Sequence, residues 1–177
     1  VCIGVSTADC IPVLLYDEEH HAAAAIHAGW RGTLARIVHK TLQEMAFAYK
    51  TDPKKLKAVI GPGISLDSFE VGDEVYEAFE QAAFPMEEIA EQRPNAAFSA
   101  DPVERDRLAA EGNIVQPLKW HINLPLCNKQ ILLHCGVAEE NIQDCGICTF
   151  QHSDEYFSAR KLGTESGRIY TAILLEK

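Results

Sequence analysis

Two short apolar runs joined by a polar link constrain the fold of this chain more than any other feature. Ile11–Tyr16 reads IPVLLY, Ala22–Ala28 reads AAAAIHA, and the link between them is DEEHH. Runs of this length and composition are typical of buried β-strands, and a short polar link between two of them predicts an antiparallel hairpin. The alanines of the second run would also suit a helix, but its length and the following Gly29 favour a strand.

The predicted hairpin carries a cysteine and a histidine at the same end. If facing residue numbers sum to about 37, Cys10 lies directly opposite His27 and the two side chains share a face. A sum of about 38 sends them to opposite faces, and the sequence does not choose between these registers. A thiolate and an imidazole on one face suit a tetrahedral zinc ion. The simpler interpretation is a buried core thiol and a core histidine.

Charged residues flank this pair. Asp9 directly precedes the cysteine, where a carboxylate could orient a metal ligand or act as a general base. Arg31 follows His27 by four residues, at the start of a helix predicted over Gly32–Tyr49. A guanidinium beside a helix N-terminus attracts anions, phosphate above all. A cap on a surface turn is the alternative role for Arg31.

The remaining elements predict α/β layers with a mixed sheet. Residues 86–111 are polar and interrupted by prolines, which predicts a loop with at most one helical turn. A third helix is expected after Asn123 as N-cap and before Gly136. Hydrophobic patterning also predicts strands over Val1–Val5, Leu56–Ile60, Gln143–Cys148 and Ile169–Leu175 and a helix over Val71–Phe84.

Composition excludes several classes of partner. The net charge of −10 argues against nucleic acid and against acidic membrane surfaces, which leaves a small molecule or a protein. No apolar run approaches the roughly 20 residues of a membrane span, and the first residues lack the basic region of a signal peptide. Six cysteines at irregular spacings in 177 residues predict free thiols and a cytoplasmic location. The oligomeric state is not indicated.

Several motifs occur in order along the chain: TADCIPVLLYD, AAIHAGWRGTLARIV, AVIGPGIS, NLPLCNKQILLHCGV and SGRIYTAILL. Together they resemble the laccase-domain family, also called multicopper polyphenol oxidase-like, or purine nucleoside phosphorylase of the peptidoglycan-editing-factor type. The resemblance implies a single domain over residues 1–177 with a four-layer α/β/β/α sandwich and mixed sheets. The family also carries a histidine upstream of the TADC motif. This sequence has no matching stretch, so we expect an N-terminally incomplete domain.

The resemblance also implies a chemistry. It implies a metal site, usually zinc, in which Cys10 and His27 match two of three ligands, and copper is possible. The implied substrates are a purine nucleoside and phosphate, with phosphorolysis of adenosine or inosine and deamination of adenosine. Arg31 and Asp9 are the expected catalytic residues, and Arg31 also binds phosphate. Thr149 and Arg160 match family positions near the pocket and are expected to bind substrate. The alternative for Arg160 is that it and the adjacent Lys161 are two solvated surface charges.

Two other functions stay open. A multicopper polyphenol oxidase requires several clusters of histidine ligands, and this chain has too few histidines to form them. A non-catalytic binding domain would follow from the absent upstream histidine. The CGIC motif over 145–148 lacks the helix start of a redox site and the second pair of a structural zinc site, so we set it aside.

Overall fold

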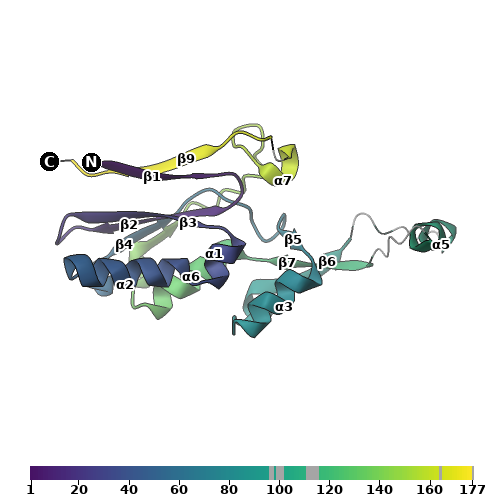
Figure 1. Cartoon of the computed structure of the whole chain (residues 1–177), viewed down its shortest axis with the longest axis horizontal. Coiled ribbons are helices and arrows are strands. Elements are labelled where there is room, and N and C mark those ends of the chain that lie inside the picture. Colours follow the sequence, from purple (N-terminus) through teal and green to yellow (C-terminus); the bar gives the residue numbers. More distant parts are fainter. Residues whose placement is uncertain (96–97, 99–101, 111–115, 164, 177) are drawn as a thin grey trace.

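The computed structural model describes residues 1–95, 98, 102–110, 116–163 and 165–176. The described residues stack as a helical layer, a four-stranded sheet and a two-stranded ribbon, with an arm extending from one end (Figure 1). This arrangement confirms the mixed α/β class with mixed sheets. No described helix is both long enough and apolar enough to span a membrane.

The four-stranded sheet is built around the predicted hairpin. Its strand order is β3-β2-β4-β8. β2 pairs antiparallel with β3 and β4, while β4 and β8 are parallel, because the chain crosses over between them through the arm and a helix. Alternate residues of β2 face the helices and are fully buried. The strands are β2 (Ile11–Asp17), β3 (Ala22–Ala28), β4 (Lys57–Ile60) and β8 (Ile142–Asp144).

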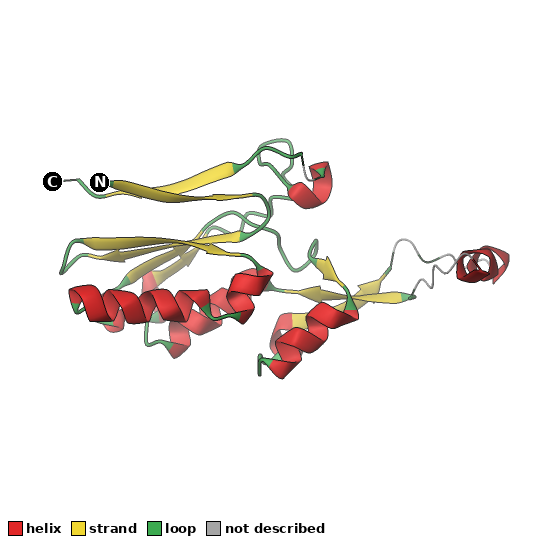
Figure 2. Ribbon diagram, in the orientation of Figure 1, coloured by secondary structure: helices red, strands yellow, loops and turns green. Residues whose placement is uncertain are grey.

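The helical layer differs from the prediction in one respect. The helix expected over 32–49 is two helices, α1 (Trp30–Leu34) and α2 (Ile37–Tyr49). Arg36 separates them with a left-handed backbone (φ 56°), which interrupts the run of helical dihedral angles. The third predicted helix is confirmed as α6 (Leu124–His134), with the Asn123 side chain accepting from the Leu126 N–H at 3.0 Å. Figure 2 shows α2 and α6 on one face of the sheet.

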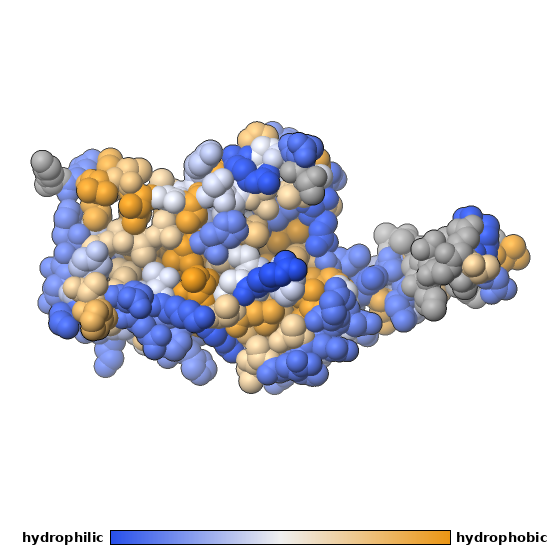
Figure 3. Space-filling view, in the orientation of Figure 1, coloured by the Kyte–Doolittle hydropathy of each residue, from blue (hydrophilic) through white to orange (hydrophobic). Residues whose placement is uncertain are grey.

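The two-stranded ribbon covers the other face of the sheet. β1 (Cys2–Thr7) pairs antiparallel with β9 (Ile169–Leu174), and the ribbon packs over β3. The alanines of β3 suit this close approach. On the outer face of the ribbon, Tyr170 and Leu174 are 81% and 61% exposed. Within the described part of the chain no helix covers these two residues, so the fourth expected layer is not seen there. Figure 3 shows apolar atoms exposed over this ribbon.

The loop prediction for residues 86–111 is wrong. Part of this stretch forms β6, whose partner is β7, and β7 also pairs with β5. The β6 residues AEQRP are polar and mostly exposed, so they lack an alternating apolar pattern, and their extended shape comes from pairing. The arm comprises β5 (Glu70–Val71), α3 (Asp73–Gln81), α4 (Met86–Ile89), β6 (Ala90–Pro94), α5 (Pro102–Ala110) and β7 (Leu118–Ile122).

Short elements complete the chain. The strand predicted over 143–148 is shorter than expected, because β8 ends at Asp144. Beyond it, the Cys145 N–H donates to the Ile60 carbonyl at 3.0 Å, and Cys148 forms an isolated bridge to Gly63. The helix predicted over 71–84 is confirmed as the shorter α3. The other short elements are η1 (Pro53–Lys55), η2 (Glu139–Asn141) and α7 (Ala159–Leu162).

Candidate functional site

Cys10 and His27 do not lie directly opposite each other in the hairpin. Pro12 faces His27, so facing residue numbers sum to 39 and neither register considered above is found. The reason is the turn. β2 continues to Asp17, which pairs with Ala22, so the turn spans residues 18–21 and is centred between residues 19 and 20 and not at residue 19. The Asp17 carboxylate accepts from the His20 backbone N–H at 3.1 Å within this turn.

The pair nevertheless shares one face, because a shift of two residues leaves every side chain on its original side of the sheet. A Cβ atom built on Gly29 would lie 2.7 Å from Cys10 Sγ and 3.7 Å from His27 Nε2. The two ligand-type atoms therefore approach the same point, and this point is open because residue 29 has no side chain. Cys10 is half-buried and His27 is exposed.

The thiol of Cys10 is protonated in the absence of a cation. Burial raises its pKa, and the neighbouring Asp9 carboxylate raises it further, while Arg168 lowers it. A metal ion bound at this position would displace the thiol proton, because the thiolate is the metal ligand.

The donor set fits two positions of a zinc ion. One thiolate and one imidazole match the ligand types of zinc, and copper(I) accepts the same types. Among the described residues no group of three histidine, cysteine or acidic side chains could hold a metal ion. A catalytic zinc site usually takes three protein ligands, so a third ligand would have to come from outside this set.

Asp9 occupies a buried position beside the pair and is fully engaged by the protein. Its Oδ1 accepts from Thr149 Oγ1 at 2.7 Å, and its Oδ2 accepts from the Arg160 backbone N–H at 2.7 Å. Its own carbonyl accepts from the Ile64 N–H at 2.8 Å. Its backbone is left-handed (φ 78°), which aspartate tolerates better than most residues. Asp9 thus joins three segments that are far apart in the sequence.

The two arginines lie on different elements. Arg160 belongs to α7, and its Nη1 donates to the Glu70 carbonyl at 2.9 Å, which ties α7 to the arm. Arg31 lies in the short helix α1, not at the start of the long one, so its electrostatic support from a helix dipole is smaller than expected. Its exposed guanidinium lies 4.1 Å from the centroid of the Trp30 ring.

Sequence reasoning missed the surroundings of Cys148. Its bridge to Gly63 brings the thiol to the GPGIS loop, where the Ser65 N–H donates to Sγ at 3.4 Å and the thiol donates to Ser68 Oγ at 3.5 Å. Burial by itself would raise the pKa of Cys148, but its hydrogen bonding with Ser65 and Ser68 outweighs this effect and lowers the pKa. Burial raises the pKa of Cys145, and both thiols of CGIC are free. The AVIGPGIS motif belongs to the family resemblance, but nothing in it indicates Cys148 as the partner of this loop.

Comparison with known proteins identifies the chain's relatives. The family described as multi-copper polyphenol oxidoreductase laccase matches residues 1–176. A "Purine nucleoside phosphorylase" from Bacteroides thetaiotaomicron is 44% identical over 176 residues, which cover 99% of this chain and 57% of that protein. An "Adenosine deaminase RL5" from an unknown prokaryotic organism is 38% identical over 173 residues, covering 98% of this chain and 58% of that protein.

Solved structures agree on the fold. The hypothetical protein YfiH from Bacillus licheniformis superposes with a TM-score of 0.78 at 24% identity, covering 99% of this chain and 58% of that one. A Neisseria meningitidis protein superposes with a TM-score of 0.73 at 30% identity, covering 99% of this chain and 61% of that one. The chain therefore spans a little over half the length of these relatives.

Proposed function

Because this chain belongs to the multi-copper polyphenol oxidoreductase laccase family, we propose that it acts on purine nucleosides, cleaving adenosine and inosine with phosphate. The observation that carries this proposal is the approach of Cys10 Sγ and His27 Nε2 to the space left open by Gly29. The relative named as a purine nucleoside phosphorylase, at 44% identity, supports the substrate class. The six free thiols support a reducing compartment such as the cytoplasm.

Cys10 and His27 are the residues that would hold zinc, with a third ligand from outside the described residues. Zinc held by three protein ligands supplies a Lewis acid with an open position for water or substrate. The protein's part is to disfavour hard cations such as magnesium and calcium through its thiolate and imidazole donors and to keep the space beside Gly29 free for the metal.

Phosphate and nucleoside need separate contacts. Arg31 is our candidate for phosphate, because its guanidinium is exposed on the helix that follows His27 and lies against the Trp30 ring. Asp9 serves as a positioning residue, because both of its oxygens already accept hydrogen bonds. Through them it holds Thr149 and the start of α7, so that Arg160 stands at a defined place beside the substrate.

Deamination of adenosine is the second candidate function. It is favoured by the relative named as an adenosine deaminase, at 38% identity. It uses water as the nucleophile where phosphorolysis uses phosphate, and a metal ion held by Cys10 and His27 would supply the Lewis acid that activates this water. A copper-dependent polyphenol oxidase is the third candidate, and the family's description as a multi-copper polyphenol oxidoreductase laccase supports it.

The test combines metal analysis with three assays. Protein purified without added metal is analysed for zinc and copper by mass spectrometry. It is then incubated with adenosine and phosphate, with adenosine alone, and with a phenol under air. We expect zinc, adenine that appears only with phosphate, and inosine without it. Copper with phenol oxidation would favour the oxidase. Nucleoside binding without turnover, by this chain and by a longer form of the protein alike, would favour a non-catalytic domain.

A further inference from the structure

One exposed aromatic ring lies on a segment that is anchored at the proposed nucleoside site. Phe157 directly precedes Ser158, the N-cap residue of α7, and α7 stands at the end of the ribbon opposite the two termini (Figure 1). Three residues after Phe157, the Arg160 backbone N–H donates to Asp9 at 2.7 Å. Because Asp9 precedes Cys10 in the chain, this hydrogen bond fixes the start of α7 beside the metal-binding hairpin.

The Phe157 ring lies flat against the backbone of Gly167. A Cβ atom built on Gly167 would lie 2.7, 2.7 and 2.8 Å from the ring atoms Cε1, Cζ and Cε2. A point at nearly equal distances from three atoms of one ring lies over the centre of its face, not at its edge. The φ of Gly167 is outside the left-handed region, so its backbone does not require glycine, and the ring itself leaves no room for a side chain. Main chain thus supports one face of Phe157.

The segment that supports the ring also leads to the hairpin. β9 begins at Ile169, two residues after Gly167, and Ile169 pairs with Thr7. Thr7 in turn lies three residues before Cys10 in the chain. The start of α7 and the start of β9, which together hold the ring, are therefore both attached to the loop that carries Cys10.

The other face of the ring is open. Phe157 is 47% exposed, and among the described residues no second aromatic ring stacks on it and no cation lies over it. Two nearby rings differ, because the Arg160 guanidinium lies 5.6 Å from the centroid of Phe69 and Lys161 Nζ lies 4.8 Å from that of Phe150. A ring with one face supported and the other free suits a nucleobase, because every base has a π face that can stack.

We propose that Phe157 is the stacking platform for the base of the nucleoside and sets the preference of the site for purines. This inference rests on the proposed function and adds the residue that contacts the base, whereas Cys10, His27 and Arg31 are assigned to the metal and to phosphate. A purine presents two fused rings to the open face of Phe157, and a pyrimidine presents one, so the purine covers more of it. Stacking of this kind depends little on the substituents of the base, so adenosine and inosine are both accepted.

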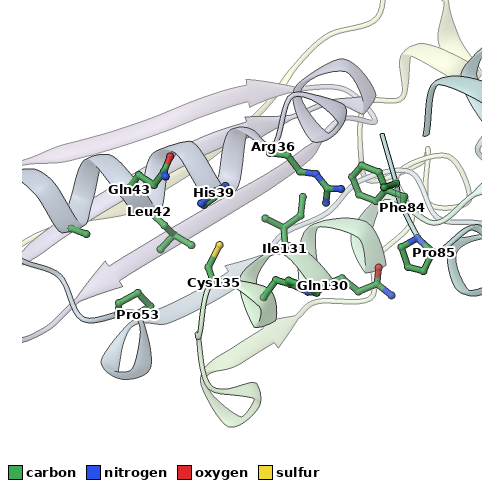
Figure 4. Close-up of a pocket in the computed structure, with 13 residues that line it drawn as sticks. Arg36, His39, Leu42, Gln43, Pro53, Phe84, Pro85, Gln130, Ile131 and Cys135 are labelled. Carbon is green, nitrogen blue, oxygen red and sulfur yellow. The ribbon is translucent and has the colours of Figure 1, made fainter. Parts of the chain in front are cut away.

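A rival location for the base lies among the helices. A cleft of about 470 Å³ between α2 and α6 is lined by Leu42, Ala46 and Ile131, among others (Figure 4). We call it the helix cleft. Neither of the two segments that hold Phe157 lines it, and it lies on the face of the sheet opposite the ribbon. Ala46→Trp would fill the helix cleft and leave the platform unchanged, so binding measurements can distinguish the two locations.

The test measures binding of inosine in a phosphate-free buffer, where phosphorolysis cannot proceed. Calorimetric titration then gives the dissociation constant directly. We expect Phe157→Ala and Phe157→Leu each to weaken binding about tenfold, and Phe157→Tyr, which keeps the ring, to bind within about twofold of the unmodified chain. Gly167→Ala places a Cβ against the ring and should weaken binding although the ring is still present. Phe47→Ala removes a 79% exposed ring from α2 and is the matched control, with unchanged affinity expected.

Uridine tests the preference for purines. We expect the unmodified chain to bind inosine more tightly than uridine, and we expect this ratio to shrink in Phe157→Ala. The zinc content of Phe157→Ala should equal that of the unmodified chain, because a phenyl ring supplies no metal ligand. Circular dichroism and thermal unfolding of each variant verify that its fold is intact.

Two results would overturn the platform and leave the proposed function standing. The first is equal affinity for inosine in Phe157→Ala and in the unmodified chain, and the second is undiminished binding by Phe157→Leu. Loss of binding in Ala46→Trp, with Phe157→Ala unaffected, would place the base in the helix cleft. Failure of the unmodified chain to bind inosine would overturn the proposed function and the platform together, so the two failures are distinguishable.

Discussion

Cys10 and His27 extend from the same face of one hairpin toward the space that Gly29 leaves empty, although they are offset along the two strands. A diagonal pair is farther apart than a directly opposed one but remains within reach of side chains of this length. The glycine therefore completes the arrangement, because any other residue at this position would place a Cβ atom between the two donors.

Removing either donor should remove the metal. We expect Cys10→Ser and His27→Gln each to lower zinc affinity by more than the roughly 10–100-fold that loss of an outer partner costs. Competition with a chromogenic zinc chelator measures this. Cys2→Ser and His39→Gln alter an exposed cysteine and an exposed histidine elsewhere and should leave the affinity unchanged. Equal zinc affinities in the four variants would show that Cys10 and His27 are structural residues and not metal ligands.

Filling the space beside Gly29 should also abolish metal binding, although Cys10 and His27 are unchanged. In Gly29→Ala the new Cβ lies 2.7 Å from Cys10 Sγ, closer than real contacts allow, so the thiol must turn away. We expect metal binding to be lost while the melting temperature changes by only a few degrees. Gly32→Ala, where a Cβ would meet the His27 carbonyl at 3.3 Å, is the control and should still bind metal. Metal content after dialysis distinguishes the two.

Asp9 should act through position and not through proton transfer. Asp9→Asn keeps one oxygen acceptor and tolerates the left-handed backbone, but it loses a charge-assisted hydrogen bond worth about 2 kcal/mol. We expect a lower melting temperature and a kcat about tenfold lower, with the pH dependence of kcat/KM unchanged. The pH–rate profile is the decisive measurement, since losing the group that acts as base would remove one limb of it.

Arg31 should contribute to the phosphorolysis of nucleosides and not to the deamination of adenosine. We expect Arg31→Ala to raise the KM for phosphate about 10–100-fold, because a charge-assisted hydrogen bond is worth about 1.5–3 kcal/mol. Deamination uses water, so its rate should stay within about twofold. Lys40→Ala removes an exposed cation from the neighbouring helix α2 and serves as the control. Parallel loss of both reactions in Arg31→Ala would instead indicate a general effect on the fold.

The turn of the hairpin should make stability depend on pH. Burial by itself would raise the pKa of Asp17, but the neighbouring Thr51 hydroxyl and His20 outweigh it and lower the pKa below its usual value. The fold therefore favours the carboxylate. This contribution is complete above the unfolded pKa of about 4 and declines as pH falls from there through the lower folded pKa.

The variant Asp17→Asn measures this contribution. We expect it to unfold about 1 kcal/mol more easily at pH 7 and to differ less from the unmodified chain at pH 3. Urea unfolding at both pH values provides the comparison, with Glu44→Gln, an exposed change on α2, as the control. A difference that grows on acidification would contradict the assignment.

The local pattern of residues in the sequence was sufficient to predict much of the fold. The β2–β3 hairpin, the strands that became β1, β4 and β9, and the helix that became α6 were all predicted, because runs of apolar residues and capping residues act within a few positions of each other. The alternation of side chains along a strand allowed a shared face for Cys10 and His27 but did not choose between the two registers considered. Where β6 lies was not predictable, because its polar residues become extended only by pairing with β7.

Contacts that the residue pattern does not record decided the rest. The hairpin register came with a local turn contact between Asp17 and His20. Packing brought Thr149 and Arg160 onto Asp9 from positions 140 and 151 residues away, and no spacing in the sequence records such a meeting. Residue type thus specified which atoms could serve as metal ligands, and the observed hairpin register decided which face they occupy. Their separation and partners depended on how the ribbon, the sheet and the helices came together, since burial and hydrogen bonding between distant segments exist only in the folded chain.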